Sequence, residues 1–263
     1  MTERLQDEST AVPQPPEPPA FGAKRALRIL MVFLGVQLAV AVVVGVFAAA
    51  HTLTKGGPPA PGGVQPAGIQ IDLGLLLAAA LVGTLLSGLA ALRMLRRSFG
   101  QAGGDAVRAA VAWTPASARD CVRAALTGFA LMAAFAVVGA ALPVRPHALG
   151  PLARAAGAGG WARLVWAALA VGVAPPVEEL VFRGALYAGL ARSWRPPWAA
   201  LATTAIFVAL HATEIGVYWP AWIAIALLGA FALRVRLTSG SLLPAIALHA
   251  SYNLGLVLIA YAR

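Results

Sequence analysis

Seven apolar runs, each long enough to cross a lipid bilayer, constrain the fold of this 263-residue chain more than any other feature. A transmembrane helix needs about 20 predominantly apolar residues. The chain offers such runs at approximately 26–50, 71–95, 121–143, 162–190, 198–213, 219–235 and 241–262. Charged residues make up 11% of the sequence, whereas a soluble domain carries about 25%. The predicted fold is therefore an all-α, polytopic transmembrane bundle of about seven spans, or eight with a broken or interfacial helix.

The segments between the runs predict how the chain is organised around the membrane. Residues 1–23 are polar and rich in proline, so we expect a disordered cytosolic tail. Residues 96–119 carry several arginines and could include a short amphipathic interfacial helix. Basic residues gather mainly at alternate ends of the runs, and the positive-inside rule then places the N-terminus in the cytosol and the C-terminus outside.

The basic residues and the single cysteine exclude two classes of function. The net charge of +10 could suggest nucleic acid, but the arginines lie at span ends, as membrane topology requires. We therefore expect no nucleic-acid partner. Cys121 is the only cysteine, so neither an intramolecular disulfide nor a cysteine-based metal cage can form.

Two adjacent carboxylates, Glu178 and Glu179, interrupt the fourth apolar run. Charged residues within spans are costly, usually face the interior of the bundle, and indicate function. Proline is well placed in a first helical turn and poorly placed inside a helix. Pro175 and Pro176 are therefore expected to break the span and to begin a new helix. The glutamates would then lie at its positive N-terminal end, which favours their ionised form.

The spacing of these charges predicts different roles for the two glutamates. Glu179 and Arg183 are four residues apart, so they can pair on one helix face and support the structure. Glu178 is rotated by about 100° from Glu179 and lacks that spacing to Arg183. We expect Glu179 to be neutralised by Arg183 and Glu178 to remain free for chemistry.

Three further polar residues, His211, His249 and Asn253, interrupt the later spans. Their distances along the spans place them, with Glu178, in one layer near mid-membrane. A carboxylate and a histidine can activate a water and return its proton to a leaving amine. A second histidine and an asparagine amide can donate hydrogen bonds to an oxyanion. Alternatively, Glu178, His211 and His249 could hold zinc with an open position.

In these three motifs the sequence resembles the CAAX prenyl protease 2 family, also called CPBP or Abi, a family of intramembrane endopeptidases with bacterial relatives linked to bacteriocin immunity. The motifs are Glu178-Glu179-x-x-x-Arg183, Phe207-x-x-x-His211 and His249-x-x-x-Asn253. The resemblance covers about residues 160–258. It implies that Glu178 and His211 activate water, that His249 and Asn253 stabilise the oxyanion, and that Glu179 and Arg183 support the site.

Together these features predict a multi-pass membrane protein of the bacterial cytoplasmic membrane, with N-terminal transmembrane helices at 24–160 and a catalytic core at 161–263. The predicted function is CAAX protease-like hydrolysis of a peptide or protein that enters from the bilayer or the cytosolic side. A catalytically silent immunity or scaffold protein and a proton-coupled transporter are the alternatives. No cofactor is favoured, because the sequence lacks H-E-x-x-H; zinc on Glu178, His211 and His249 is the competing interpretation.

Overall fold

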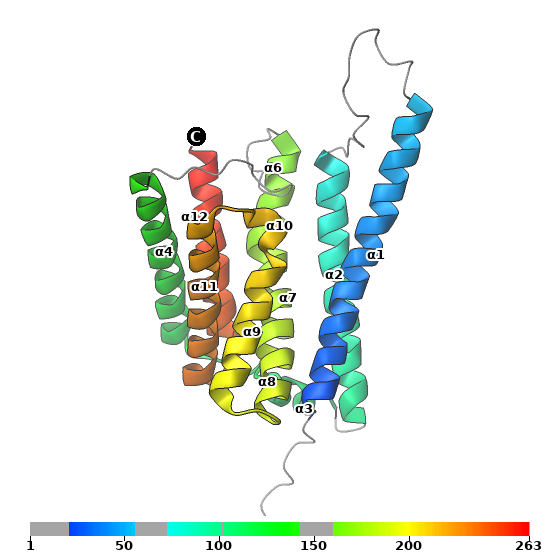
Figure 1. Ribbon diagram of the computed structural model, residues 1–263. Helices are drawn as coiled ribbons and strands as arrows, with labels where there is room; N and C mark the ends of the chain where they lie inside the picture. The colour runs from blue at the N-terminus through cyan, green and yellow to red at the C-terminus, as the bar shows by residue number, and fades with distance from the viewer. Residues whose placement is uncertain (1–20, 56–72, 101–102, 143–159, 263) are drawn as a thin grey trace, which may run out of the picture.

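The protein is a bundle of roughly parallel and antiparallel helices (Figure 1). The structure, a computed structural model, describes residues 21–55, 73–100, 103–142 and 160–262. Most of the predicted tail at 1–23 therefore lies outside the described residues. The described residues contain helices and turns and no β-strand, which confirms the predicted all-α fold.

The first three spans match the predicted runs closely. They are α1 (Ala23–Lys55), α2 (Leu73–Phe99) and α4 (Ala118–Ala141). Between α2 and α4 lies the short helix α3 (Gly103–Ala110), which buries Val107 and exposes its charged side chains. It corresponds to the interfacial helix expected within 96–119.

The fourth span is one helix of 32 residues, Gly160–Ala191. Its α-helical parts α6 (Gly160–Ala167), α7 (Ala174–Glu179) and α8 (Tyr187–Ala191) are joined by two π-helical segments, η2 (Ala168–Val173) and η3 (Leu180–Leu186). The remaining helices are α9 (Pro196–Leu210), the single turn α10 (Ala212–Ile215), α11 (Trp219–Ser239) and α12 (Leu242–Tyr261).

Six of the described helices are long and apolar enough to cross a membrane, and α9 is shorter, with 15 residues. At 1.5 Å per residue α9 reaches about 22 Å, less than the roughly 30 Å of a hydrocarbon core. The single turn α10 follows it after His211 and extends the chain toward the end of the bundle that contains the C-terminus. With α9 included, the fold agrees with the predicted bundle of about seven spans.

Small residues set the closest helix contacts around the last span. A Cβ on Gly128 of α4 would lie 2.1 Å from the carbonyl oxygen of Leu248 on α12, so only glycine permits this approach. Beside it, the Ser251 hydroxyl donates to the carbonyl of Ala125 at 2.8 Å. α12 is thereby held against α4 on one side and packs against α11 on another.

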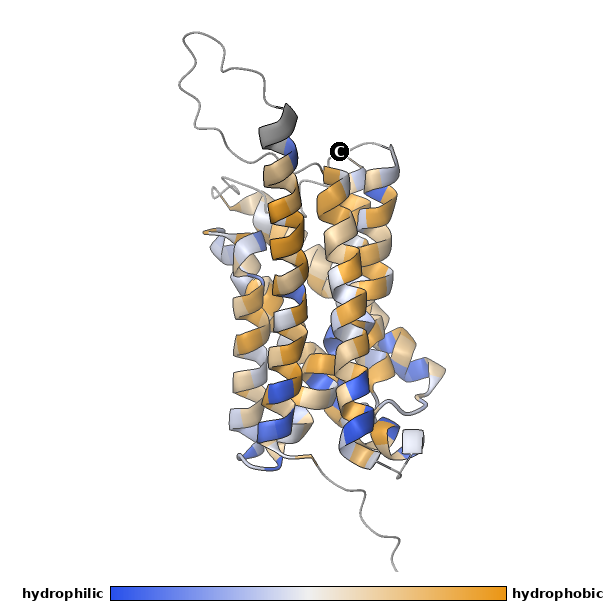
Figure 2. Ribbon diagram, turned by 90° about the vertical axis from the view of Figure 1, so that its right-hand side faces the viewer, coloured by the Kyte–Doolittle hydropathy of each residue, from blue (hydrophilic) through white to orange (hydrophobic). Residues whose placement is uncertain are grey.

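The two ends of the bundle differ in polarity (Figure 2). Hydrophilic residues concentrate at the end where α1 begins, whereas the helices are hydrophobic along most of their length. Figure 1 places α3 and the start of α9 at that end, and α10 and the C-terminus at the opposite end. Apolar side chains also remain exposed on the outer faces of the helices, as a lipid environment requires.

Candidate active site

The helix that carries the two glutamates is not broken at the prolines. Val173, directly before α7, has helical dihedral angles (φ −106°, ψ −51°), and the helix continues through Pro175 and Pro176. The expected new N-terminus, and the positive end it would give the glutamates, are therefore wrong. The wider π-helical turn of η2 absorbs the prolines, because a proline ring would otherwise clash with the carbonyl one turn earlier.

Asn253 completes the hydrogen bonding that Pro175 interrupts. In a π-helix each N–H donates to the carbonyl five residues earlier, and Ala174 donates to Leu169 in this way. The next donor in the ladder would be residue 175, with Ala170 as its acceptor, but proline has no N–H. The Asn253 side-chain amide donates to the Ala170 carbonyl instead, at 2.7 Å. This bond ties α12 to the glutamate helix.

Glu179 is completely buried between two cationic or polar partners. Its Oε1 atom accepts a hydrogen bond from Nη1 of Arg183 at 2.9 Å, which is the ion pair expected from their spacing. The same oxygen lies 2.9 Å from Nδ1 of His249. A buried carboxylate is stable only when it is paired and hydrogen-bonded, so Arg183 and His249 together account for its position.

Phe207 holds these charged side chains from a third direction. Its ring centroid lies 4.2 Å from the Arg183 guanidinium carbon, within the range of a cation–π contact. The rings of His211 and His249 lie 4.6 Å and 5.9 Å from it. Phe207 is fully buried, which agrees with a packing role for the first residue of its motif.

Glu178 has a different environment from that of Glu179. Its side chain is 21% exposed, whereas that of Glu179 is 0% exposed. Its Oε2 atom lies 3.9 Å from Nε2 of His249, too far for a hydrogen bond, and has no hydrogen-bond partner among the described residues. Oε2 of Glu179 also has no such partner, so the two glutamates differ in exposure and in the pair with Arg183, which only Glu179 makes, as the spacing predicted.

Glu178 and His211 line the same cavity, which has a volume of about 340 Å³. His211 ends α9, and its Nδ1 atom lies 2.8 Å from the carbonyl oxygen of Phe207, which leaves Nε2 for another partner. The cavity is bounded by α1, α2, the glutamate helix and the α9–α10 corner. Its polar lining residues are Gln37, Thr84, Glu178, His211, Thr213 and Glu214, with Trp166 among the others.

His249 and Asn253 are not among the residues that line this cavity. Both lie directly behind its wall: His249 contacts Glu179 and approaches Glu178, and Asn253 bonds to Ala170, itself a lining residue. The structure therefore brings the four predicted residues into one region. It gives His249 and Asn253 partners that sequence reasoning missed, because those partners come from a helix some 70 or more residues away in sequence.

Gln37 and Thr84 are also lining residues that the sequence interpretation missed. Gln37 had a detectable signal, since it is the one amide side chain within the long apolar first run. An isolated polar residue in a span is costly and often functional.

The predicted zinc ligands do not form a metal-binding group in this geometry. Among the described residues, no three His, Cys, Asp or Glu side chains are placed to hold a metal ion. A catalytic zinc site needs three protein ligands around one point.

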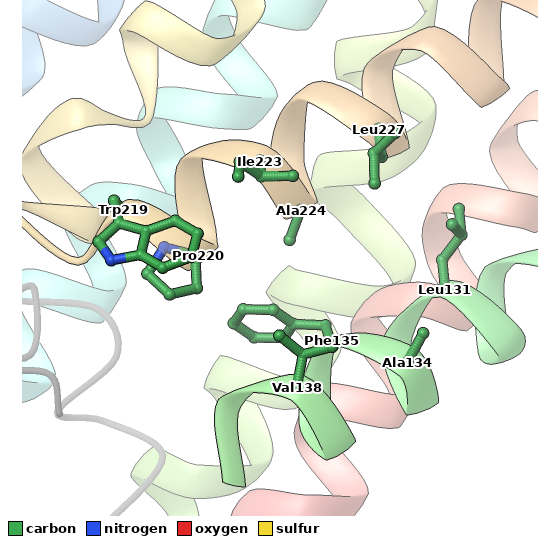
Figure 3. Close-up of a pocket in the computed structure, with 9 residues that line it drawn as sticks. All are labelled: Leu131, Ala134, Phe135, Val138, Trp219, Pro220, Ile223, Ala224 and Leu227. Atoms are coloured by element: carbon green, nitrogen blue, oxygen red, sulfur yellow. The ribbon is translucent and has the colours of Figure 1, made fainter. Parts of the chain in front are cut away.

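A second, apolar pocket lies between α4 and α11 (Figure 3). Phe135 and Val138 of α4 face Trp219 and Ile223 of α11 across it. Its lining carries no carboxylate, imidazole or amide side chain. It therefore offers no group for hydrolysis.

Comparison with known families agrees with the motif resemblance. Residues 160–255 match the model of the type II CAAX prenyl endopeptidase Rce1-like family. This segment is an Rce1-like domain. It extends from α6 into α12 and contains all seven motif residues described above. No curated protein and no solved structure matched the chain significantly. The chain is thus an integral, multi-pass membrane protein with an Rce1-like protease-family domain.

Proposed function

We propose that the protein is an intramembrane endopeptidase in which Glu178 activates the water that hydrolyses a peptide bond. The observation that carries this proposal is the contrast between the two adjacent glutamates. Glu179 is buried and bonded to Arg183 and His249, whereas Glu178 faces the cavity that it shares with His211. A carboxylate open to a cavity and beside a histidine is suited to deprotonate a bound water.

In the proposed reaction, a water lies between Glu178 and His211. Glu178 takes one proton as the water oxygen attacks the peptide carbonyl, which forms a tetrahedral oxyanion. The carbon–nitrogen bond then breaks, and the proton held by Glu178 passes to the leaving amine. One water and one peptide bond give one carboxylic acid and one amine, so no further reactant is needed.

The oxyanion requires hydrogen-bond donors, and His249 and Asn253 are proposed for this role. Nε2 of His249 lies 3.9 Å from Oε2 of Glu178, behind the cavity wall, and Nδ1 lies 2.9 Å from Oε1 of Glu179. A ring nitrogen that carries a proton can donate to an oxyanion. Asn253 has a second amide hydrogen besides the one bonded to Ala170.

The proposed substrate is a peptide or a protein that the membrane presents to the cavity. Thr213 and Glu214 of α10 belong to the cavity wall, and α10 lies at the end of the bundle that contains the C-terminus (Figure 1). This placement favours entry from the bilayer or from that end over entry from the cytosolic side. No zinc is required by the proposed mechanism.

A peptidase assay in detergent with a fluorogenic peptide library tests the proposal. We expect wild type to cleave a subset of peptides, and Glu178→Gln to abolish cleavage while detergent melting stays nearly unchanged. Asp105→Asn, an exposed carboxylate on α3, is the matched control and should keep full activity. Absence of turnover by wild type on every peptide would instead support a catalytically silent membrane protein or a transporter.

A further inference from the structure

The first two spans lie outside the Rce1-like segment, yet they form one wall of the cavity. Two of their polar side chains, Gln37 of α1 and Thr84 of α2, line it together with Glu178. None of the hydrogen bonds among the described residues involves the Gln37 amide or the Thr84 hydroxyl. Polar groups inside a membrane protein are costly unless they have partners, so these two side chains call for a partner in the cavity.

The packing around Gln37 places it level with Glu178. Phe33 of α1 meets Phe182 of η3 edge to face, with ring centroids 6.2 Å apart. Gln37 follows Phe33 by four residues, and Glu178 precedes Phe182 by four. Because α1 and the glutamate helix run in opposite directions (Figure 1), both residues lie about one turn from that contact toward α10.

The same reasoning places Thr84. Gly88 of α2 packs against Val177, since a Cβ on Gly88 would lie 3.0 Å from both Val177 methyl carbons. Thr84 precedes Gly88 by four residues, so it lies one turn further toward α10. α1 and α2 touch beside it, where a Cβ on Gly83 would lie 3.7 Å from Val40.

We propose that Gln37 and Thr84 form a subsite that binds the peptide backbone of the substrate next to the scissile bond. This inference rests on the proposed function. A carboxamide donates and accepts hydrogen bonds, as a peptide group does, so Gln37 can satisfy one N–H and one C=O together. A peptide bond that leaves water for the membrane needs such partners.

Gln37 and Thr84 can bind different peptide groups of one extended chain. Each residue of such a chain advances by about 3.4 Å and carries a backbone N–H and a C=O. One helical turn, the separation between the levels of Gln37 and Thr84, is about 5 Å. Gln37 therefore binds a peptide group at the level of Glu178, and the Thr84 hydroxyl binds another one toward α10. Both are positioning residues, because the reacting groups are Glu178 and its water.

Steady-state kinetics test the subsite, with a fluorogenic peptide that the wild-type enzyme cleaves. Gln37→Met keeps the length of the side chain but removes the amide, and we expect kcat/KM to fall about tenfold. Thr84→Val should have a smaller effect in the same direction. The matched controls are Leu38→Met and Ser87→Ala. Leu38 lies on the exposed face of α1. The Ser87 hydroxyl donates to the Thr84 carbonyl, and Ser87 does not line the cavity. Both controls should keep wild-type constants.

Ester-substituted peptides identify the bond that Gln37 makes. In a series of peptides, one amide N–H at a time is replaced by an ester oxygen, at positions on either side of the scissile bond. One of these peptides lacks the N–H that donates to Gln37. At one position wild type should prefer the amide about tenfold, and Gln37→Met should lose most of that preference. An equal preference in both enzymes at every position, or unchanged constants in Gln37→Met, would overturn the subsite while leaving the peptidase intact. No cleavage by wild type would overturn both proposals.

Discussion

At the scale of single residues, two neighbouring glutamates have opposite environments. A rotation of about 100° between consecutive helical residues points them in different directions. Glu179 then faces Arg183 and His249, and Glu178 faces the cavity. The i, i+4 spacing within one helix predicted the Arg183 pair. The His249 contact could not be predicted, because it joins side chains 70 residues apart in sequence and depends on how α12 packs.

Substitutions in this pair should separate activity from stability. Glu178→Gln should abolish hydrolysis and barely shift detergent melting, because its Oε2 atom has no hydrogen-bond partner to lose among the described residues. Glu179→Gln or Arg183→Met leaves a buried charge without its partner, at a cost of about 3–5 kcal/mol. Both should therefore lower the melting temperature. Clean loss of activity in Glu179→Gln, with an active Glu178→Gln, would reverse the two roles.

The metal prediction also concerns single side chains. The geometry around Glu178, His211 and His249 does not assemble a three-ligand site, so we expect the purified enzyme to stay active after dialysis against a chelator. Elemental analysis should find substoichiometric zinc per chain, and the zinc content should be the same in wild type and in Glu178→Gln. Stoichiometric zinc, together with activity that is lost on chelation and restored by zinc, would contradict the metal-independent mechanism.

At the scale of elements, the hydrophobic pattern predicted the helices and missed the form of one of them. The seven runs agree with the observed helices to within a few residues at most ends. The prolines were expected to break the fourth span, but η2 carries the helix through them. Sequence alone could not reveal this, because the freed Ala170 carbonyl is satisfied by Asn253 from another span.

The relation between Pro175 and Asn253 gives a prediction for this element. Asn253→Leu should lower stability by about 1–3 kcal/mol, since it leaves the Ala170 carbonyl unpaired. Pro175→Ala restores the backbone N–H that can donate to the Ala170 carbonyl. In the double variant with Asn253→Leu, it should therefore recover much of the lost stability. Pro176→Ala is the matched control, because its N–H would reach a different carbonyl. Thermal melting in detergent is compared for Asn253→Leu, Pro175→Ala, Pro176→Ala and the double variant Asn253→Leu/Pro175→Ala, and the comparison measures the coupling between Asn253 and Pro175.

Activity in the same variants separates the two functions proposed for Asn253. If it also donates to the oxyanion, Asn253→Leu should lower kcat by about 10²–10³ with little change in KM. Pro175→Ala should not restore that kcat, even where it restores stability. Recovery of both together would mean that Asn253 acts only by holding the helix.

At the scale of the whole molecule, the site is assembled from both parts of the chain. The Rce1-like segment supplies the seven motif residues, whereas α1 and α2 complete the cavity with Gln37 and Thr84. Motif reasoning found the first group because its spacing follows one family signature. It missed the second. Gln37 was detectable as the one amide in the first apolar run, whereas no local pattern marks which face of a long apolar helix will meet the cavity.

The arrangement of the helices also predicts how the chain crosses the membrane. With α9 counted, the part of the chain that the structure describes holds an odd number of spans, so α1 begins and α12 ends at opposite ends of the bundle. α3 lies at the hydrophilic end where α1 begins, and α10 lies at the other end with the C-terminus (Figures 1 and 2). The positive-inside rule assigns the first of these ends to the cytosol.

Topology reporters should therefore give opposite results at the two ends. A fusion at residue 105, in α3, should report the cytosol, and a fusion at residue 216, after α10, should report the outside. A third fusion at the C-terminus serves as an internal control and should agree with the one at 216. If residues 105 and 216 reported the same side, α9 would not cross the membrane. The cavity that it closes with His211 would then need a different arrangement of the last three helices.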